Sequence, residues 1–501
     1  MQTGVVGMMR FPSLPPKRRA LLAVAANPGA PEDVLLRLLS VEHGRMQVAR
    51  YCTDITPRLR ERLLASGDTL TLCAVARNRA LPLAVRRELG SHPDTEVRAA
   101  AVGRYPGLSD GTDRAGLLEM FRAAARDEVV EVRVALADNA NVPQEIVGQL
   151  ASDPAPEVRA ALAGSMYRAE LAPVWRSLLT DPDGSVRVAA VSNGWFPPIP
   201  ADLSTGLLTD PLTRVRALHN GSSHLSAALA DGFAADPDDD IRSSLAVHPM
   251  LPARLVPVLV ADRSAHVRAG IALRRDISEE LRGELTAQIG LRGENTPDIP
   301  SSDEDFDREF ARACLSFGWM SSEMCWMSEV SPDAGAAYLA SPHAFLRRAA
   351  VSRAPLAPDV LETLFEDADL QVASLAAVHH PDPPGEVLER LYVARGAGVK
   401  PHIPLLDHRN FPRAAFTRFA GHPDARVRAA ACRDPQLPAA LVGELAADPE
   451  PFVRAAAAGH PNLPERLIPV LLEDDGSSVP ESLGASPALT VGWMHRLLDS
   501  A

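Results

Sequence analysis

A two-part pattern of polar and apolar positions recurs along most of the chain. From Asp448 the sequence reads "DPEPFVRAAAAGHPNLPERLIPVLLEDD", and the preceding copy starts 26 residues earlier, at His422. The first part carries Asp or His, then Pro, a branched aliphatic residue, Arg and several alanines. Asp caps free N–H groups at a helix start, and Pro at the first helical position has no N–H to leave unpaired. This part therefore predicts a short helix with a thin apolar face.

The second part opens at a turn with two prolines, which stop the first helix, and then carries Val, Leu or Ile at helical spacing. The position five residues after its opening Pro is a helix breaker in several units: Gly148, Gly443, Pro257 or Pro469. In a helix interior, Gly costs about 1 kcal/mol and Pro about 3 kcal/mol. We therefore expect a second segment of about two turns that is distorted toward 3₁₀ geometry.

The copies recur mostly every 26 residues, with wider steps where loops lengthen, and they indicate about fourteen two-helix units. A unit this small cannot bury its own apolar face and becomes stable only by stacking on its neighbours. The pattern predicts an all-α solenoid with an N-terminal array over 20–275 and a C-terminal array over 336–501. Residues 1–19 are expected to form a tail. Residues 276–335 interrupt the pattern with an acidic stretch and an aromatic and Met-rich stretch.

The joined phrases "D-P-x-x-x-V-R-x-A" and "N-P-x-L-P-x-x-V-L-x-x-L" resemble the leucine-rich repeat variant family, which is similar in style to HEAT-repeat solenoids. The resemblance covers most of both arrays and includes the order of the two parts. It implies a right-handed superhelix of paired short helices, and it implies no reaction. The iron–sulfur module of a known member cannot be carried over, because Cys52 and Cys73 stand alone.

The amino-acid composition limits the cellular compartment and the classes of partner that we expect for this chain. The chain has 501 residues, of which 46% are hydrophobic and 5% aromatic, so its core is built mainly from Ala, Leu and Val. The net charge of −13 argues against broad binding to nucleic acid or anionic lipid. The five scattered cysteines form no C-x-x-C pair, which fits a reducing cytoplasm. We see no signal peptide or membrane span and expect a cytoplasmic protein, with a composition typical of a GC-rich bacterial genome.

The most regular candidate chemistry is an arginine column, with each Arg six residues after the first residue of its unit. Stacked guanidinium groups could bind a phosphate backbone. We favour a structural ladder in which each Arg reaches the Asp six residues before it, because that Asp is present in most units and the chain is acidic. The ladder comprises Asp127, Arg133, Asp153, Arg159, Asp181, Arg187, Asp210, Arg216, Asp236, Arg242, Asp262, Arg268, Asp448 and Arg454.

Five histidines precede Pro at turn positions where other units carry Asn or Asp, for example Asn27 and Asp434. A metal site needs three or four converging ligands. Histidines spread one to a unit at a turn position are better explained as turn residues than as metal ligands. They are His92, His248, His380, His422 and His460.

The aromatic and Met-rich stretch 310–327 has two interpretations. Met and Trp fill irregular gaps where a repeat is interrupted, and they are also over-used at partner-binding surfaces. We favour core filling and keep partner binding open. The candidate partner-binding residues are Phe317, Trp319, Met320, Met324 and Trp326.

The sequence contains no phosphate loop, dinucleotide fingerprint, nucleophile elbow or H-E-x-x-H motif. We therefore predict a non-catalytic scaffold that binds a protein or peptide partner on its extended surface, without cofactor or metal. The alternative is a HEAT-like protein that binds nucleic acid through the Arg column, including a base-excision glycosylase with Trp175 and Trp195 as a stacking shelf. A regulatory scaffold for a neighbouring enzyme also stays open.

Overall fold

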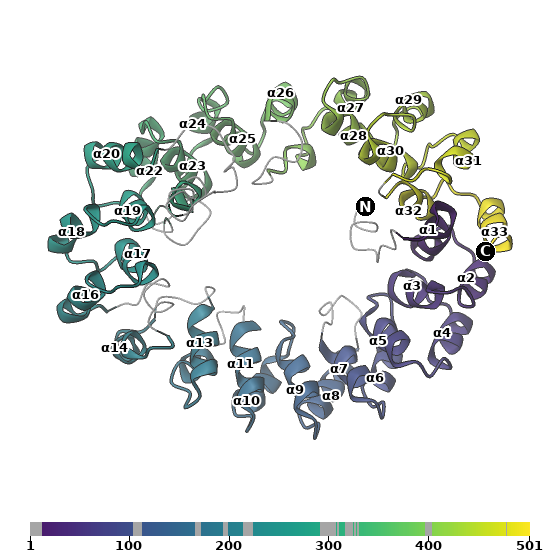
Figure 1. Cartoon of the computed structure of the whole chain (residues 1–501), viewed down its shortest axis with the longest axis horizontal. Helices are drawn as coiled ribbons and strands as arrows, with labels where there is room; N and C mark the ends of the chain where they lie inside the picture. Colours follow the sequence, from purple (N-terminus) through teal and green to yellow (C-terminus); the bar gives the residue numbers. More distant parts are fainter. Residues whose placement is uncertain are drawn as a thin grey trace. The chain divides into compact units, whose positions relative to one another are not determined.

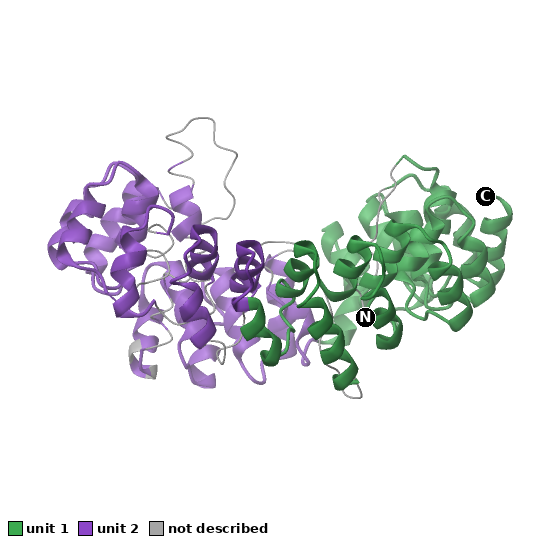
Figure 2. Cartoon of the chain, turned by 90° about the horizontal axis from the view of Figure 1, so that it is seen from below, with its two compact units in different colours: residues 1–150, 396–400, 412–501 green, residues 151–395, 401–411 purple. Residues whose placement is uncertain are grey.

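The computed structural model describes residues 13–103, 113–165, 172–193, 199–213, 224–290, 307, 310–315, 324, 327, 330–395, 403–476 and 478–501. The regular structure in these ranges is entirely helical. The chain divides into two compact units. Unit 1 comprises 1–150, 396–400 and 412–501, and unit 2 comprises 151–395 and 401–411 (Figure 2).

Each unit is a stack of layers, and most described layers contain a first helix and a second helix, as the sequence predicts. In unit 1 the first helices are α1 (Pro16–Ala23), α3 (Gly44–Tyr51), α5 (Thr69–Arg77), α7 (Thr95–Gly103), α9 (Val130–Ala137), α28 (Ala425–Ala431), α30 (Pro451–Ala458) and α32 (Val479–Gly484). The second helices are α2 (Glu32–Leu38), α4 (Pro57–Leu64), α6 (Leu83–Leu89), α8 (Arg114–Ala124), α10 (Gln144–Ala151), α27 (Arg413–Phe419), α29 (Ala439–Leu445), α31 (Ile468–Leu471) and α33 (Val491–Asp499). Because α1 begins at Pro16, part of the segment expected to be a tail is helical.

Unit 2 repeats this arrangement. Its first helices are α11 (Pro156–Ser165), α13 (Gly184–Ser192), α17 (Asp239–Val247), α19 (Ala265–Ala272), α23 (Ala344–Arg353) and α25 (Leu370–His379). Its second helices are α12 (Ala172–Leu178), α14 (Ala201–Thr209), α16 (Ala227–Ala234), α18 (Val256–Val260), α20 (Glu279–Ile289), α22 (Pro332–Ala337), α24 (Pro358–Glu362) and α26 (Gly385–Arg395). Short 3₁₀ turns occur in both units: η1 (Val24–Ala26), η3 (Ala253–Leu255), η6 (Tyr338–Ala340), η7 (Leu405–Asp407) and η8 (Glu465–Leu467).

First helices pack directly on first helices of neighbouring layers, as α5 does on α7 and α17 on α19. In each unit they lie along one side of the stack and the second helices along the other (Figure 1). The predicted branched aliphatic position is buried in these first helices. Val97, Ile241 and Val453 have no exposed surface, and the equivalent Val132 is 1% exposed. Full burial of such a side chain contributes about 1.5–3 kcal/mol, so this position supplies much of the stability between layers.

The expected distortion of the second helix occurs where its fifth position is Pro. The turns η3 and η8 precede α18 and α31, and Pro257 and Pro469 lie in the first turn of the α-helix that follows. A Pro there removes only an N–H that the first turn leaves unpaired. Where the same position is Gly148 or Gly443, α10 and α29 are continuous α-helices, because Gly keeps its N–H.

Among the described residues, no helix is both long and apolar enough to span a membrane. The array boundaries expected at 275 and 335 stay predictions.

Gly148 offers a direct test of helix propensity in the second helices. It is exposed within α10, and a Cβ there would meet no atom within 4 Å. We expect Gly148→Ala to stabilise unit 1 by about 0.5–1 kcal/mol, because Ala loses less backbone entropy on folding than Gly. Native-state hydrogen exchange of the α10 amides measures this gain. Unchanged or faster exchange would mean that the local backbone requires Gly.

Candidate functional site

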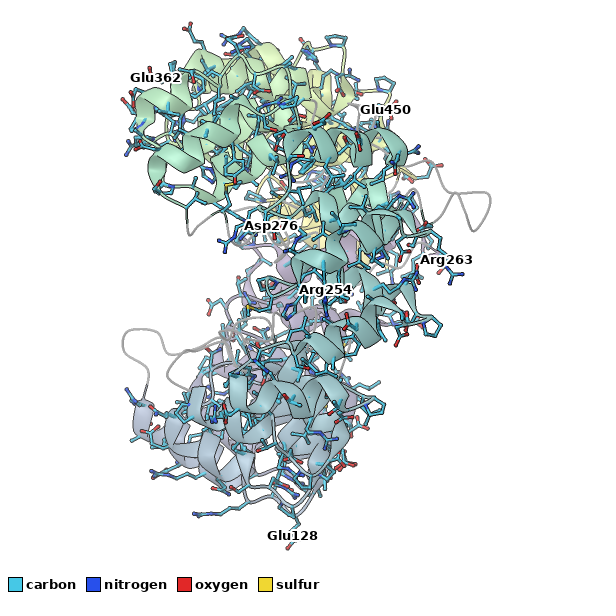
Figure 3. The ribbon with its side chains drawn as sticks, turned by 90° about the vertical axis from the view of Figure 1, so that its left-hand side faces the viewer. Glu128, Arg254, Arg263, Asp276, Glu362 and Glu450 are labelled. Atoms are coloured by element: carbon cyan, nitrogen blue, oxygen red, sulfur yellow. The ribbon has the colours of Figure 1, made fainter. Side chains whose placement is uncertain are left out.

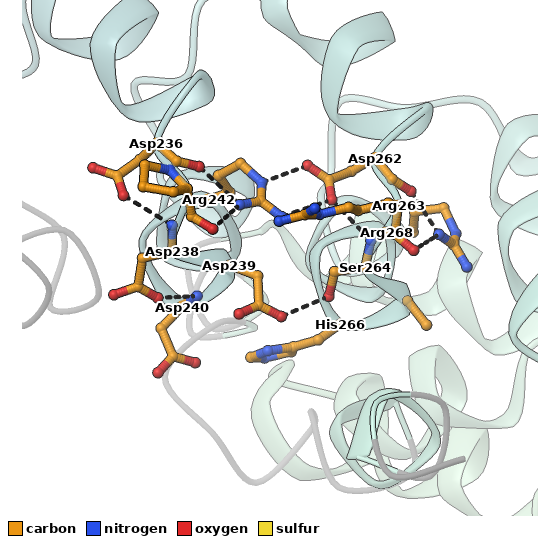
Figure 4. Close-up of polar contacts among 12 residues, drawn as sticks. Asp236, Asp238, Asp239, Asp240, Arg242, Asp262, Arg263, Ser264, His266 and Arg268 are labelled. Atoms are coloured by element: carbon orange, nitrogen blue, oxygen red, sulfur yellow. Dashed lines mark hydrogen bonds and ion pairs between the residues drawn. The ribbon is translucent and has the colours of Figure 1, made fainter. Parts of the chain in front are cut away.

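The ladder arginines connect the loops of successive layers. Arg242 donates from Nε and Nη2 to the two carboxylate oxygens of Asp262, at 2.7 and 3.1 Å. Its Nη1 donates to the backbone carbonyls of Asp236 and Pro237, at 2.8 and 3.1 Å (Figure 4). One guanidinium therefore holds the loop that precedes its own helix and the loop of the next layer.

This geometry corrects the predicted partner. The Asp six residues before each Arg accepts through its backbone carbonyl, and the ion pair is made with the Asp of the following layer. The reason is that the carboxylate at the helix start is already turned toward the N–H two residues later, as Asp236 is toward Asp238. The described inter-layer ion pairs are Arg98–Asp127, Arg159–Asp181, Arg187–Asp210, Arg242–Asp262, Arg347–Asp367, Arg428–Asp448 and Arg454–Asp474.

The remaining ladder residues make the same backbone contacts, apart from Arg216. Arg133 and Arg268 each donate from Nη1 to the carbonyl six residues earlier, at 2.8 and 2.6 Å. The Asp153 carboxylate accepts the backbone N–H of Ala155 at 2.9 Å. Arg216 lies outside the described residues.

The environment of Asp127 and Asp448 favours the charged form of both carboxylates. The hydrogen bonds from Arg98 lower the pKa of Asp127, and those from Arg428 lower the pKa of Asp448. In each case the N–H two residues later adds a smaller contribution in the same direction. These carboxylates are therefore ionised and fully engaged at neutral pH, which makes them structural groups rather than proton-transfer groups.

A second column of polar contacts lies at the turn between the two helices of a layer. The amide Nδ2 of Asn78 donates to the carbonyls of Ala49 and Cys52 in the preceding layer, at 2.9 and 3.0 Å. Its Oδ1 accepts the N–H of Ala80 at 2.8 Å. Asn139 and Asn193 also donate to first-helix carbonyls of preceding layers. These side chains thus bind each turn to the end of the first helix of the preceding layer.

His248, His380 and His460 occupy this same turn column. His92 and His422 instead begin the loop before a first helix, where Arg98 and Arg428 bind their carbonyls. The turn role predicted for the five histidines is confirmed. In each, the ring Nδ1 accepts the backbone N–H two residues later, at 3.0 or 3.1 Å: His92, His248, His380, His422 and His460. His460 also places Nε2 2.8 Å from the carbonyl oxygen of Asp434 in the preceding layer. A ring whose two nitrogens bind backbone groups has none left for a metal. Within the described ranges, no group of three or more His, Cys, Asp or Glu could hold a metal ion.

Two buried arginines were not anticipated from the sequence. Arg86 and Arg282, each 1% exposed, extend from second helices to carbonyls at the end of their own layer's first helix. Arg86 donates to Ala76 and Asn78, and Arg282 makes the equivalent contacts in unit 2. A cation at a helix C-terminus satisfies carbonyls that have no partner within the helix. Their only signal in the sequence is Arg at an otherwise apolar position of the second part.

The aromatic and Met-rich stretch is described only in part. Met324 is completely buried, which favours core filling for this residue. Phe310 is exposed and lies edge-on against His266, with ring centroids 4.6 Å apart. The other candidate partner-binding residues lie outside the described residues, and their role stays a prediction: Phe317, Trp319, Met320 and Trp326.

A surface that the sequence analysis missed lies along the first turns of the first helices. We call it the first-helix face, and in unit 1 its exposed residues are Lys17, Arg45, Leu70, Glu96, Glu131, Arg426 and Phe452. Leu70 is 65% exposed and Phe452 is 45% exposed, which is unusual for large apolar side chains. In the sequence, this surface corresponds to the residue directly before the buried aliphatic position. That residue is polar in α7, where it is Glu96, and apolar in α30, where it is Phe452.

Comparison with known proteins identifies no family. No family model matches the chain, and no curated protein matches it. Among solved structures, the karyopherin Kap121p, bound to the extreme C-terminus of the protein phosphatase Cdc14p, is 14% identical with a TM-score of 0.24. The match covers 94% of this chain and 55% of that one, so this chain spans about half of that karyopherin chain. An engineered protein is 17% identical, with 85% and 96% covered and a TM-score of 0.17.

These likenesses carry no information on function. The helical layers establish the fold by themselves. The chain is an all-α repeat protein.

The buried ladder should contribute more stability than an exposed ion pair of the same type. We expect Arg242→Ala to cost about 2–4 kcal/mol, because it leaves the Asp262 carboxylate, 9% exposed, without its guanidinium. The control is Arg254→Ala, which removes an exposed ion pair with Asp231. Arg254 is 49% exposed and lies on the side of unit 2 that faces the viewer in Figure 3. That change should cost less than about 1 kcal/mol. Native-state hydrogen exchange of α17 and α19 measures both, and equal costs would contradict a structural ladder.

Acid should weaken the ladder. Folding lowers the pKa of Asp127 and Asp448, so the unfolded chain binds more protons once the pH falls below the unfolded value of about 3.9. The stability that these groups contribute is fully present above about pH 5 and is lost progressively below about pH 4. The urea midpoint, measured by circular dichroism between pH 6 and pH 3, should show this fall. A midpoint that stays constant down to pH 3 would contradict it.

Proposed function

We propose that the chain is a non-catalytic repeat scaffold that binds a protein or peptide partner on its first-helix face. The observation that carries this proposal is that seven ladder guanidinium groups are held within the layers by ion pairs to the next loop: Arg98, Arg159, Arg187, Arg242, Arg347, Arg428 and Arg454. The first-helix face of unit 1 combines the apolar side chains of Leu70 and Phe452 with acidic and basic side chains. Apolar side chains surrounded by polar residues are typical of surfaces that recognise proteins.

The same observation counts against the nucleic-acid alternative. Phosphate binding needs free donors, and in Arg242 the Nε, Nη1 and Nη2 groups all donate to loop oxygens. Trp175, one of the two residues considered for a stacking shelf, is 3% exposed and donates its indole N–H to the Ala190 carbonyl at 2.8 Å. A buried indole cannot stack on a displaced base. Trp195 lies outside the described residues.

We also propose that the repeats are of the leucine-rich repeat variant type. The 26-residue step and the alternation of a first α-helix with a second helix support this assignment. The 3₁₀ turns η3 and η8 at the start of second segments are in keeping with it. This assignment concerns the architecture and adds no partner.

The test replaces exposed apolar residues on the first-helix face of unit 1 and compares the loss of partner capture with that caused by a replacement on the second-helix side. We expect Leu70→Glu/Phe452→Glu to reduce partner capture about tenfold or more, because a charge on each apolar contact must be desolvated on binding. The matched control is Val470→Glu, which alters a 68% exposed residue of α31 on the second-helix side. The measurement is affinity capture from lysate of the source organism, with and without nuclease, followed by mass spectrometry.

Three outcomes decide the proposal. Protein partners that survive nuclease, disappear with the double variant and persist with Val470→Glu support it. Recovery of nucleic acid that is lost on nuclease treatment and at raised salt supports the Arg-column alternative. Equal capture by all three chains shows that the first-helix face of unit 1 is not the binding surface.

A further inference from the structure

The first and last layers of the chain pack against each other within unit 1. Helix α1 lies on α32, and α2 lies on α33 (Figure 1). These helices are separated by more than 450 positions in the sequence, yet first helix meets first helix and second helix meets second helix. The order of layers in unit 1 therefore continues from the end of the chain into its beginning.

The turn column shows that this junction has the register of an ordinary layer contact. Asn27 donates from Nδ2 to the carbonyls of Gly484 and Ser486, at 3.0 and 2.6 Å, and its Oδ1 accepts the N–H of Gly29 at 2.8 Å. Asn78 makes the same three contacts with its own neighbours. The first layer thus occupies the place that a layer following α33 would take.

The ion pairs at the junction differ from the ladder. Arg19 lies 3.3 Å from the Glu481 carboxylate, and the two side chains are 7% and 8% exposed. Arg19 also donates to the carbonyl of Asp475 at 3.4 Å. On the second-helix side, Arg37 donates to Asp499 at 2.6 Å. A buried pair of this kind is well suited to specify which surfaces meet, because either charge buried alone is costly.

The backbones approach closely at one glycine. A Cβ on Gly484 would lie 2.1 Å from the carbonyl oxygen of Ala20 and 2.8 Å from the Cβ of Ala23. Any side chain at this position must push α1 away from α32. The junction consequently requires Gly484, although α32 itself would tolerate Ala there.

We propose that this junction is an exchangeable contact, which closes within one chain and also pairs with the complementary end of a second copy. Other neighbouring layers of unit 1 follow one another along the chain, whereas the junction is held by non-covalent contacts between distant segments. It can therefore open without unfolding any layer. A second copy of the chain presents the same first-layer and last-layer surfaces. The first layer of one copy can therefore pack on the last layer of the other through the contacts that close the junction within one chain. This proposal does not depend on the proposed function.

Lysine chemistry gives a specific probe of the closed junction. The chain has two lysines, and the Lys17 ammonium forms an ion pair with the Glu473 carboxylate across the junction. A zero-length carbodiimide cross-linker should join Lys17 to Glu473 in the full-length protein, and mass spectrometry of the digest identifies the product. Absence of this cross-link in the wild-type protein would overturn the proposal.

Glycine variants then test the packing. We expect Gly484→Ala to reduce the Lys17–Glu473 cross-link about tenfold or more, because the added methyl group meets backbone atoms. The control is Gly148→Ala, where a Cβ meets no atom within 4 Å, and it should leave the yield within about twofold. Circular dichroism checks that both variants stay helical. Equal yields in the two variants would overturn the inferred packing.

Removal of the buried charges separates loss of the junction from loss of folding. Arg19→Met and Glu481→Met should each reduce the cross-link, because each leaves one buried charge without its partner. The double variant should regain most of it, since two apolar side chains can pack in place of the pair. A double variant as poor as the single variants would contradict the role assigned to this ion pair.

Isotope mixing tests exchange between copies. Unlabelled and ¹⁵N-labelled chains are incubated together at high concentration, diluted and cross-linked. Lys17–Glu473 products that combine a labelled and an unlabelled peptide support pairing between copies, and their fraction should rise with the concentration of the incubation. Products that never mix, at any concentration, would overturn the exchange and leave a junction that closes only within one chain.

Discussion

Stacking is the constraint on which the rest of this structure depends, because a pair of short helices cannot bury its own apolar face. The ladder arginine makes the stacking specific. In Arg428, Nε and Nη2 hold the Asp448 carboxylate of the next loop, while Nη1 holds the carbonyls of His422 and Pro423. A planar guanidinium can bind both loops at once, whereas an ammonium offers no such fork. This accounts for Arg at the column in a chain that has two lysines.

The ladder also separates the residues that build the scaffold from those that are free to contact a partner. In α30, Val453 is buried and Arg454 binds the next loop, while Phe452 directly before them is exposed. In α7, the residue at the position of Phe452 is Glu96. The surface residue thus changes from layer to layer while the buried aliphatic and the Arg stay the same. A repeat protein of this kind can acquire a binding surface without altering the contacts that hold its layers together.

The sequence was sufficient for features that each unit determines locally. Val97 and Val453 could be placed in the core because a branched residue recurs at a fixed distance after a helix start. The partner of each ladder Arg could not be assigned, since Arg242 has Asp236 six residues before it and Asp262 twenty residues after it. A unit that begins with Asp offers both choices, and only the direction of stacking decides between them. Units that begin with His, such as that of Arg98, offer only the Asp of the next layer. The exposure of Phe452 was missed for a related reason, because an apolar residue beside the core position resembles the core itself.

The junction between the first and last layers was beyond sequence reasoning for a deeper reason. Inter-layer contacts in this fold are made by local elements, such as the turn amide of Asn27, that act in the same way whichever layer lies next to them. A repeated contact carries no information about which layer is its partner. That information must come from chemistry that is not repeated, and the buried ion pair of Arg19 and Glu481 supplies it at the junction. Gly484 adds a steric requirement, which the first-helix residue Gly44 shares where α3 meets Leu38. The specificity of the junction therefore lies in its departures from the repeat, while its affinity comes from the repeat itself.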